Sequence, residues 1–360
     1  MDRRRPDRHR LLRSTGTAAV ALALTAAGTA AAAAAPDDAA ASATAQSYVA
    51  LGDSFSSGTG TRASTDSCYR SPYGFPVLIA QGRGLDLDYQ ACSGATTADV
   101  RANQLGALSA DTDYVTITIG GNDLDFAGVI TQCALPGWLS DCQGRINRSL
   151  GLLRTSMPAR YDSLFGEIAA RAPEADVVVG SYPRLFNGQD CNLATFFSAA
   201  EMRSLNSATD ELAGTIERRA DAADFRYVDP RPAFTGHAVC DRVEWVNGLS
   251  LPVVESFHPN RAGNVAYAEV FWPGSTTAAA GARTMGTGPA SAPVDDVRAR
   301  AEAVLAMDLT SRENLAAARA AGVPAGELLR LVRQLRSSDT ATVEQALEGL
   351  QRLDEQHSTD

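Results

Sequence analysis

The sequence predicts an α/β fold in which helices cover both faces of a parallel sheet. Short β-branched or aromatic segments, bounded by Gly, Asp or Pro, alternate along the chain with longer segments of helical spacing. This alternation is typical of strands that run in one direction and are joined by crossing helices. The expected strands cover residues 48–51, 85–89, 114–119, 177–179 and 225–228.

The expected helices lie between and after these strands. They cover residues 73–81, 100–108, 145–171, 195–220 and 260–270, the last of them starting behind Pro259. In parallel sheets the functional site lies at the carboxyl ends of the strands. Three expected strands end in polar or glycine-rich turns, which we expect to meet at one edge: Gly52-Asp53-Ser54, Ser93-Gly94-Ala95 and Gly120-Gly121-Asn122-Asp123.

Residues 1–45 have the pattern of an export signal peptide and are excluded from the fold. A head with six Arg precedes an Ala/Leu/Val run over residues 17–35, and small residues at 41–45 offer cleavage sites. A membrane anchor is the alternative, but the run is rich in alanine and only weakly apolar. We therefore expect a secreted, extracellular protein.

The remaining chain divides into a domain, a linker and a helical extension. We assign the domain to residues 46–273 and the linker to residues 274–293, which are mostly Gly, Ala, Thr, Ser and Pro. Residues 294–360 contain neither aromatic residues nor cysteine. Segments 294–307, 311–321, 325–336 and 341–353 have helical spacing, as expected for a small bundle, a partner-binding tail or a marginally stable segment.

Composition excludes several classes of function. The 360 residues carry a formal net charge of −10 and no basic stripe, which argues against a nucleic-acid partner. The chain contains no lysine. Hydrolysis by a Ser-Lys pair, Schiff-base chemistry and a phosphate-binding lysine are therefore excluded.

The chain has six cysteines, which for an exported protein indicates three disulfide bonds. Fifteen pairings are possible in principle, and pairs of sequence neighbours are the simplest. Since no Cys-x-x-Cys is present and histidines are few, a zinc site is not expected. The neighbour pairs are Cys68 with Cys92, Cys133 with Cys142, and Cys191 with Cys240.

Ser54 and His258 are the candidate nucleophile and base. A serine hydroxyl needs a group that removes its proton, and histidine has a suitable pKa of about 6.5. Taken alone, Gly-Asp-Ser is also typical of a helix N-cap, and the Gly-x-Ser-x-Gly elbow is absent from the sequence. His237, the other histidine of the expected domain, has the surroundings of a surface loop.

Asn122 and Gly94 are candidate donors to an oxyanion. The side-chain amide of Asn122 and the backbone N–H groups of Gly94 and Ser54 would converge if the three turns are adjacent. Considered separately, Gly120-Gly121-Asn122-Asp123 is equally typical of an ordinary turn that ends a strand.

In combination, these segments resemble the four sequence blocks of the SGNH (GDSL) hydrolases. The resemblance covers residues 46–272, and the cysteines are similar to those of the secreted actinobacterial esterase and lipase branch. It implies a flavodoxin-like α/β/α sandwich with three sequential disulfides. It also implies Ser54 as nucleophile and oxyanion donor, Gly94 and Asn122 as further donors, and His258 as base.

One position departs from the family pattern. Most members have Asp three residues before the histidine, where it holds the imidazole ring, whereas this chain has Glu255. In the branch that the chain resembles, a main-chain carbonyl often takes that role. The Glu255 carboxylate, the Glu255 carbonyl and the Ser256 carbonyl therefore remain alternatives for orienting His258.

The resemblance implies a secreted serine esterase or lipase that forms an acyl-Ser54 intermediate without a metal or organic cofactor. The expected partner is a small-molecule or lipid ester, bound by a monomer without a stable membrane span. Apolar residues near Asn122 and Cys191 favour lipid or acyl esters if several of them are exposed near Ser54, and packing in the core or in loops is the alternative for each. These residues are Leu124, Phe126, Ile130, Leu135, Trp138, Leu139, Leu185, Phe186, Phe196 and Phe197. A carbohydrate O-deacetylase and a non-catalytic secreted binding protein are the alternatives.

Overall fold

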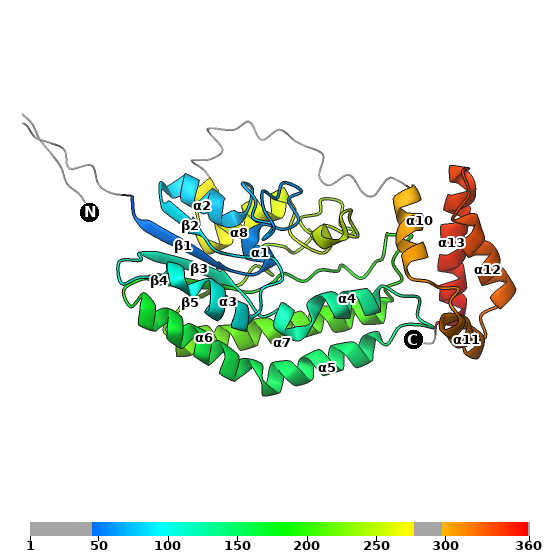
Figure 1. The fold of residues 1–360 in the computed structure, drawn as a ribbon, viewed down its shortest axis with the longest axis horizontal. Coiled ribbons are helices and arrows are strands. Elements are labelled where there is room, and N and C mark those ends of the chain that lie inside the picture. The colour runs from blue at the N-terminus through cyan, green and yellow to red at the C-terminus, as the bar shows by residue number, and fades with distance from the viewer. Residues whose placement is uncertain (1–44, 277–296, 359–360) are drawn as a thin grey trace, which may run out of the picture. The chain divides into compact units, whose positions relative to one another are not determined.

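The computed structural model describes residues 45–276 and 297–358 and contains the predicted α/β fold (Figure 1). Five parallel strands form one sheet in the order β2-β1-β3-β4-β5. The proposed signal peptide and most of the proposed linker lie outside the described residues. The strands are β1 (Ser47–Gly52), β2 (Asp86–Tyr89), β3 (Tyr114–Thr118), β4 (Asp176–Gly180) and β5 (Arg226–Val228).

The three central strands form the core of the sheet. Val49 of β1 is in register with Val115 of β3, which is in register with Val177 of β4. These valines are almost completely buried, as expected for strands covered on both faces. The apolar run of each strand therefore fixes its place at the centre of the sheet.

Helices cover both faces of the sheet, as the flavodoxin-like prediction requires. Figure 1 shows α2 (Phe75–Arg83) and α8 (Arg261–Phe271) on one face. Phe75 and Phe271 stack there with ring centroids 4.5 Å apart. The other face carries α3 (Thr97–Asn103), α5 (Cys142–Thr155), α6 (Met157–Arg171) and α7 (Ala199–Ala222).

Some helix boundaries differ from the predicted ones. The expected helix at 145–171 is two helices that meet at Ser156, because Pro158 lies in the first turn of α6 and donates no hydrogen bond to a preceding turn. The helix expected at 100–108 begins at residue 97, since Thr96 and Asp99 form a capping box. The helix α4 (Phe126–Cys133) was not predicted.

The C-terminal segment is helical where it is described. Its elements are α10 (Val297–Ala306), α11 (Arg312–Ala320), α12 (Ala325–Gln334) and α13 (Thr340–His357). They share a buried apolar cluster that contains Leu328, Leu347 and Leu350 and extends to Phe196. None of the helices in the described ranges is both long and apolar enough to span a membrane.

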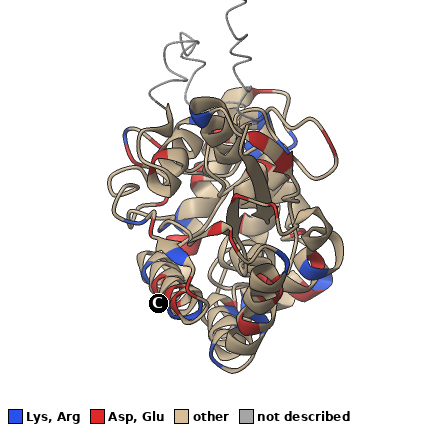
Figure 2. Ribbon diagram, turned by 90° about the vertical axis from the view of Figure 1, so that its left-hand side faces the viewer, with Lys and Arg blue, Asp and Glu red and all other residues tan. Residues whose placement is uncertain are grey.

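The six cysteines form three disulfide bonds, each between sequence neighbours. They are Cys68–Cys92, Cys133–Cys142 and Cys191–Cys240. The arginines and the acidic residues are interspersed over the ribbon in the view of Figure 2. In this view the ribbon is therefore not divided into a basic and an acidic half.

Candidate active site

The turn after β1 places Ser54 at the carboxyl edge of the sheet. Gly52 has φ +123°, and a Cβ on it would lie 2.3 Å from the carbonyl oxygen of Thr118 in the neighbouring strand. Only glycine allows this close approach. The carboxylate of Asp53 then accepts the N–H of Phe55 at 3.1 Å and caps α1 (Ser54–Ser57), so that Ser54 begins the helix.

Ser54 and His258 are in hydrogen-bond contact although 204 positions separate them in the chain. The Nε2 atom of His258 lies 2.7 Å from Oγ of Ser54, and its Nδ1 atom lies 2.8 Å from the carbonyl oxygen of Ser256. A carbonyl only accepts, so Nδ1 carries the hydrogen and Nε2 is left to accept the serine proton. This is the tautomer that a general base for Ser54 needs.

The burial of His258 favours the uncharged ring. Only 8% of the residue is exposed, and this burial lowers the pKa of the imidazole to about 4. Backbone carbonyls of Ser256 and Val254 act in the opposite direction with smaller effect. The ring is therefore neutral, and able to accept a proton, at neutral pH.

The Glu255 carboxylate binds backbone N–H groups, whereas the family pattern implies that it would bind the His258 ring. Glu255 is 3% exposed, and its Oε2 atom accepts the backbone N–H groups of Gly60 at 2.5 Å and Arg62 at 3.3 Å. Of the three alternatives for orienting His258, the group in contact with Nδ1 is the Ser256 carbonyl. The carboxylate instead ties the His258 loop to the turn at residues 60–62.

The turns after β2 and β3 meet at the same edge. The side-chain amide of Asn122, at the start of η2 (Asn122–Leu124), donates to the carbonyl oxygen of Ala95 at 3.0 Å. Asp123 accepts the N–H of Thr97 at 2.8 Å and its hydroxyl at 2.7 Å. An amide nitrogen carries two hydrogens, so Asn122 retains one for a substrate. Gly94, in the same turn as Ala95, is exposed.

Tyr182 joins two of these turns and was missed by the sequence reasoning. Its buried hydroxyl donates to the Asp53 carboxylate and accepts the N–H of Gly121 at 3.1 Å. Asp53 directly precedes Ser54, and Gly121 directly precedes Asn122. One hydroxyl therefore couples the backbone at the candidate nucleophile to the backbone at a candidate oxyanion donor. The available signal was the position of Tyr182, two residues after β4 ends.

Asp53 is the buried acid of this network. Burial raises the pKa of its carboxyl to about 6, and hydrogen bonds from Tyr182 and Thr118 oppose the shift. The negative charge of Asp123 raises the same pKa further. Asp53 is consequently ionised at neutral pH and protonated in mildly acidic solution.

A small cavity of about 50 Å³ opens at Ser54 and Asn122. Its apolar wall is formed by Phe126, Pro183, Leu185 and Leu212. Two of these, Phe126 and Leu185, belong to the apolar residues that we expected near a substrate. Most of the other expected residues are packed instead, in agreement with their alternative interpretation. Leu124, Ile130, Phe186 and Phe197 lie in the main buried cluster and Phe196 in the C-terminal one, against which the partly buried Trp138 and Leu139 pack.

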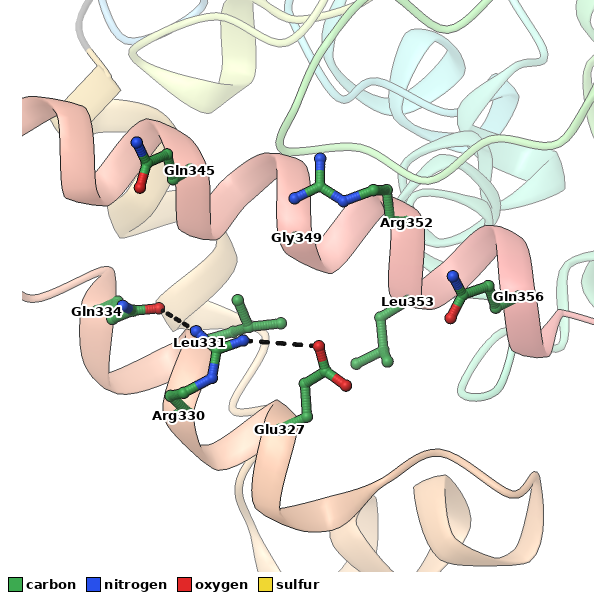
Figure 3. Close-up of a pocket in the computed structure, with 9 residues that line it drawn as sticks. All are labelled: Glu327, Arg330, Leu331, Gln334, Gln345, Gly349, Arg352, Leu353 and Gln356. Carbon is green, nitrogen blue, oxygen red and sulfur yellow. Dashed lines mark hydrogen bonds and ion pairs between the residues drawn. The ribbon is translucent and has the colours of Figure 1, made fainter.

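A larger cavity of about 320 Å³ lies between α12 and α13 (Figure 3). Its lining side chains bind one another: Arg330 pairs with Glu327 at 3.5 Å and donates to Gln334 at 2.8 Å. The lining includes no serine, cysteine or histidine. We therefore place the candidate active site in the smaller cavity.

The described residues contain one cluster with the composition of a metal site. It consists of Cys191, Cys240 and Glu244. The two sulfur atoms are joined in a disulfide, so they are not thiolate ligands. The cluster therefore does not offer the donor set of a zinc site.

Comparison with known proteins identifies the family. Residues 50–266 match the GDSL-like Lipase/Acylhydrolase family. A lipase of Streptomyces rimosus is 40% identical over 224 residues, which are 61% of this chain and 82% of the relative.

Solved structures agree with the sequence match. Phospholipase A1 of Streptomyces albidoflavus NA297 is 37% identical with a TM-score of 0.60, over 63% of this chain and 98% of that one. An extracellular lipase of Streptomyces rimosus is 36% identical with a TM-score of 0.58, over 66% of this chain and 100% of that one. The chain therefore belongs to the GDSL-like lipase and acylhydrolase family and is an esterase or lipase.

Proposed function

We propose that the protein is a secreted serine hydrolase that cleaves carboxylic esters of acyl lipids through an acyl-Ser54 intermediate. The observation that carries the proposal is the buried contact of 2.7 Å between Ser54 Oγ and His258 Nε2, beside a cavity with an apolar wall. The Ser256 carbonyl, rather than Glu255, is the group that we propose to orient His258.

The first half of the reaction transfers the acyl group to the enzyme. Ser54 Oγ attacks the ester carbonyl while His258 Nε2 accepts the hydroxyl proton. The negative charge that develops on the carbonyl oxygen is stabilised by the Asn122 amide and by the N–H groups of Ser54 and Gly94. The protonated His258 then gives its proton to the leaving alcohol as the carbon–oxygen bond breaks.

The second half releases the acid. His258, neutral again, removes a proton from a water molecule that attacks the acyl-Ser54 carbonyl, and the same donors stabilise the new oxyanion. The proton on His258 returns to Ser54 as the carboxylic acid leaves. These steps use only side chains and backbone groups of this chain.

The apolar wall supports an acyl group as the part of the substrate that enters the cavity. Phe126, Leu185 and Leu212 come from three different segments and face the same space as Ser54. The similarity to a phospholipase A1 and to lipases supports the same substrate class.

Export is a further part of the proposal. The basic head and alanine-rich run of residues 1–45 have the pattern of a signal peptide, and the three disulfides suit an oxidising compartment. The similar lipase of Streptomyces rimosus is described as extracellular. We assign catalysis to residues 46–273, acting as a monomer, and place a linker at 274–293 before the helical extension at 294–360.

The proposal is tested with p-nitrophenyl esters from acetate to palmitate. We expect hydrolysis with a preference for acyl chains longer than acetate, and a loss of about 10⁴-fold or more in Ser54→Ala. Equal rates for the two proteins would exclude Ser54 as the nucleophile. A preference for acetate would favour a deacetylase instead.

A further inference from the structure

The two most exposed large apolar side chains among the described residues lie on one loop. Val253 is 61% exposed and Leu251 is 46% exposed, and both flank the exposed Pro252. We call residues Leu251-Pro252-Val253 the apolar tip. Single exposed apolar residues are common on protein surfaces, whereas contiguous ones form a candidate contact surface.

Hydrogen bonds hold the loop residues on both sides of the apolar tip. The N–H of Ser250 donates to Oγ of Ser256 at 2.8 Å, across the loop. The guanidinium of Arg62 donates to the hydroxyl of Ser250 at 3.2 Å, and the Glu255 carboxylate holds the N–H of Gly60. Hydrogen bonds therefore hold both ends of the loop, while the side chains of the tip are exposed to solvent.

The apolar tip is close to the reacting groups. Five positions separate Val253 from His258, and an extended chain of that length spans at most about 17 Å. The 3₁₀ turn η3 (Val253–Glu255) shortens this distance. The same loop also supplies the Ser256 carbonyl that contacts His258. The tip therefore lies within about 17 Å of His258 along the same loop.

We propose that the apolar tip docks the enzyme on the surface of aggregated, zwitterionic or neutral acyl-ester lipid. Insertion of leucine and valine into the acyl region of such a surface removes apolar area from water. The inference rests on the proposed function, since the lipid at the tip would contain the acyl esters that we propose Ser54 to cleave.

Charge decides which lipid surface fits. The chain has a formal net charge of −10, which opposes approach to an anionic surface. Arg62 donates to Ser250 at the base of the loop, and the tip residues Leu251-Pro252-Val253 carry no charged side chain. Apolar insertion, rather than attraction by a basic patch, is therefore the expected driving force.

The test is sedimentation of the full chain with vesicles of ether-linked phosphatidylcholine, which has no ester to cleave. We expect the variant with Leu251→Ser and Val253→Ser to partition onto the vesicles about tenfold less than the unaltered protein. The matched control replaces Leu152 and Val243, each 42% exposed and outside the loop, by Ser and should bind within about twofold of the unaltered protein.

Hydrolysis separates the two proposals. The tip variant should cleave soluble p-nitrophenyl butyrate at the unaltered rate, which also shows that it is folded, and cleave ester-linked phosphatidylcholine vesicles about tenfold more slowly. Unchanged vesicle partitioning in the tip variant would overturn the inference while leaving the hydrolase intact. Tighter binding to anionic phosphatidylglycerol that survives the tip substitutions would overturn it as well. Failure of the proposed function itself would appear as no hydrolysis of either ester, with ether-lipid binding unaffected.

Discussion

Two cavities in the described residues differ in size and in chemistry. The cavity between α12 and α13 measures about 320 Å³ and is lined mainly by Arg, Gln and Glu. The cavity at the carboxyl edge of the sheet measures about 50 Å³ and is lined by Ser54 and Asn122. His258 forms a hydrogen bond with Ser54 there. The lining groups, and not the volume of the cavity, therefore identify the candidate active site.

The polar groups of the two cavities are also held differently. Arg330 and Arg352 are half exposed, and they pair with acidic residues of their own helices at 3.5 and 3.6 Å. Exposed pairs of this kind contribute little to stability. Asp53 and His258 are buried instead, and burial shifts both of their pKa values. Such shifts are typical of reacting groups.

The Tyr182→Phe substitution tests the network at the smaller cavity and has the largest expected effect among the substitutions that leave Ser54 and His258 in place. Loss of the hydroxyl uncouples Asp53 from Gly121, so we expect kcat to fall about 10- to 100-fold with KM within about twofold. Steady-state kinetics on p-nitrophenyl butyrate measure this.

Tyr48→Phe is the matched control for Tyr182→Phe. Tyr48 is fully buried, and its hydroxyl bonds to Thr116 at 2.6 Å within the sheet, away from the turns. This variant should keep its kcat. If Tyr182→Phe loses no more activity than Tyr48→Phe, the coupling role of Tyr182 is wrong.

The pH dependence of kcat/KM should show two steps. As pH falls through about 6, protonation of Asp53 weakens its bond to Tyr182, and kcat/KM should drop about fivefold. Below about pH 4, protonation of His258 removes the base, and the rate should fall about tenfold per pH unit. Asp53→Asn should abolish the first step and keep the second. A single transition near pH 6.5 would contradict both assignments.

The Glu255→Gln substitution tests whether the Glu255 carboxylate takes part in the reaction. Because the carboxylate contacts Gly60 and Arg62 rather than the ring, kcat should stay within about threefold. The free energy of unfolding, measured with urea, should fall by about 1.5–3 kcal/mol as the charged acceptor is lost. A loss of turnover comparable to that of a missing base would assign the orienting role to Glu255.

Arg330→Ala and Arg352→Ala have the smallest expected effect and probe the larger cavity. Their ion pairs are exposed, so we expect ester hydrolysis within about twofold of the unaltered rate and little change in stability. Rates on short and long p-nitrophenyl esters provide the measurement. A tenfold decrease for either variant would make this cavity part of the substrate path, so that the cavity at Ser54 would no longer be the only one involved in hydrolysis.

Much of the fold and the meeting of the turns that carry Ser54 and Asn122 could be predicted because they follow from local patterns. β-branched runs such as Val177–Val179 predict buried strands, and parallel strands bring the turns at Ser54 and Asn122 to one edge. The break at Ser156 was missed although Pro158 is a local signal for it. The helix α4 was missed because it has only eight residues and its N-cap residue Asp125 makes no side-chain capping hydrogen bond.

The fine positioning of the site was beyond the sequence. The position of Tyr182 just after β4 is a local signal, but it does not identify the partner Asp53, which lies 129 positions away in the chain. The group that orients His258 depends on the direction of one carbonyl in the segment from Glu255 to Ser256. All three alternatives were adjacent in the sequence, and only the backbone path places the Ser256 oxygen at Nδ1.

The most direct test of the central claim is covalent labelling with an alkyl fluorophosphonate, followed by intact-mass and peptide-mass analysis. We expect one phosphonyl group per chain on Ser54, with loss of fluoride. We also expect no adduct in Ser54→Ala and much slower labelling in His258→Ala, because Nε2 accepts the Ser54 proton. An adduct on another residue, or equal labelling of Ser54→Ala, would contradict that claim.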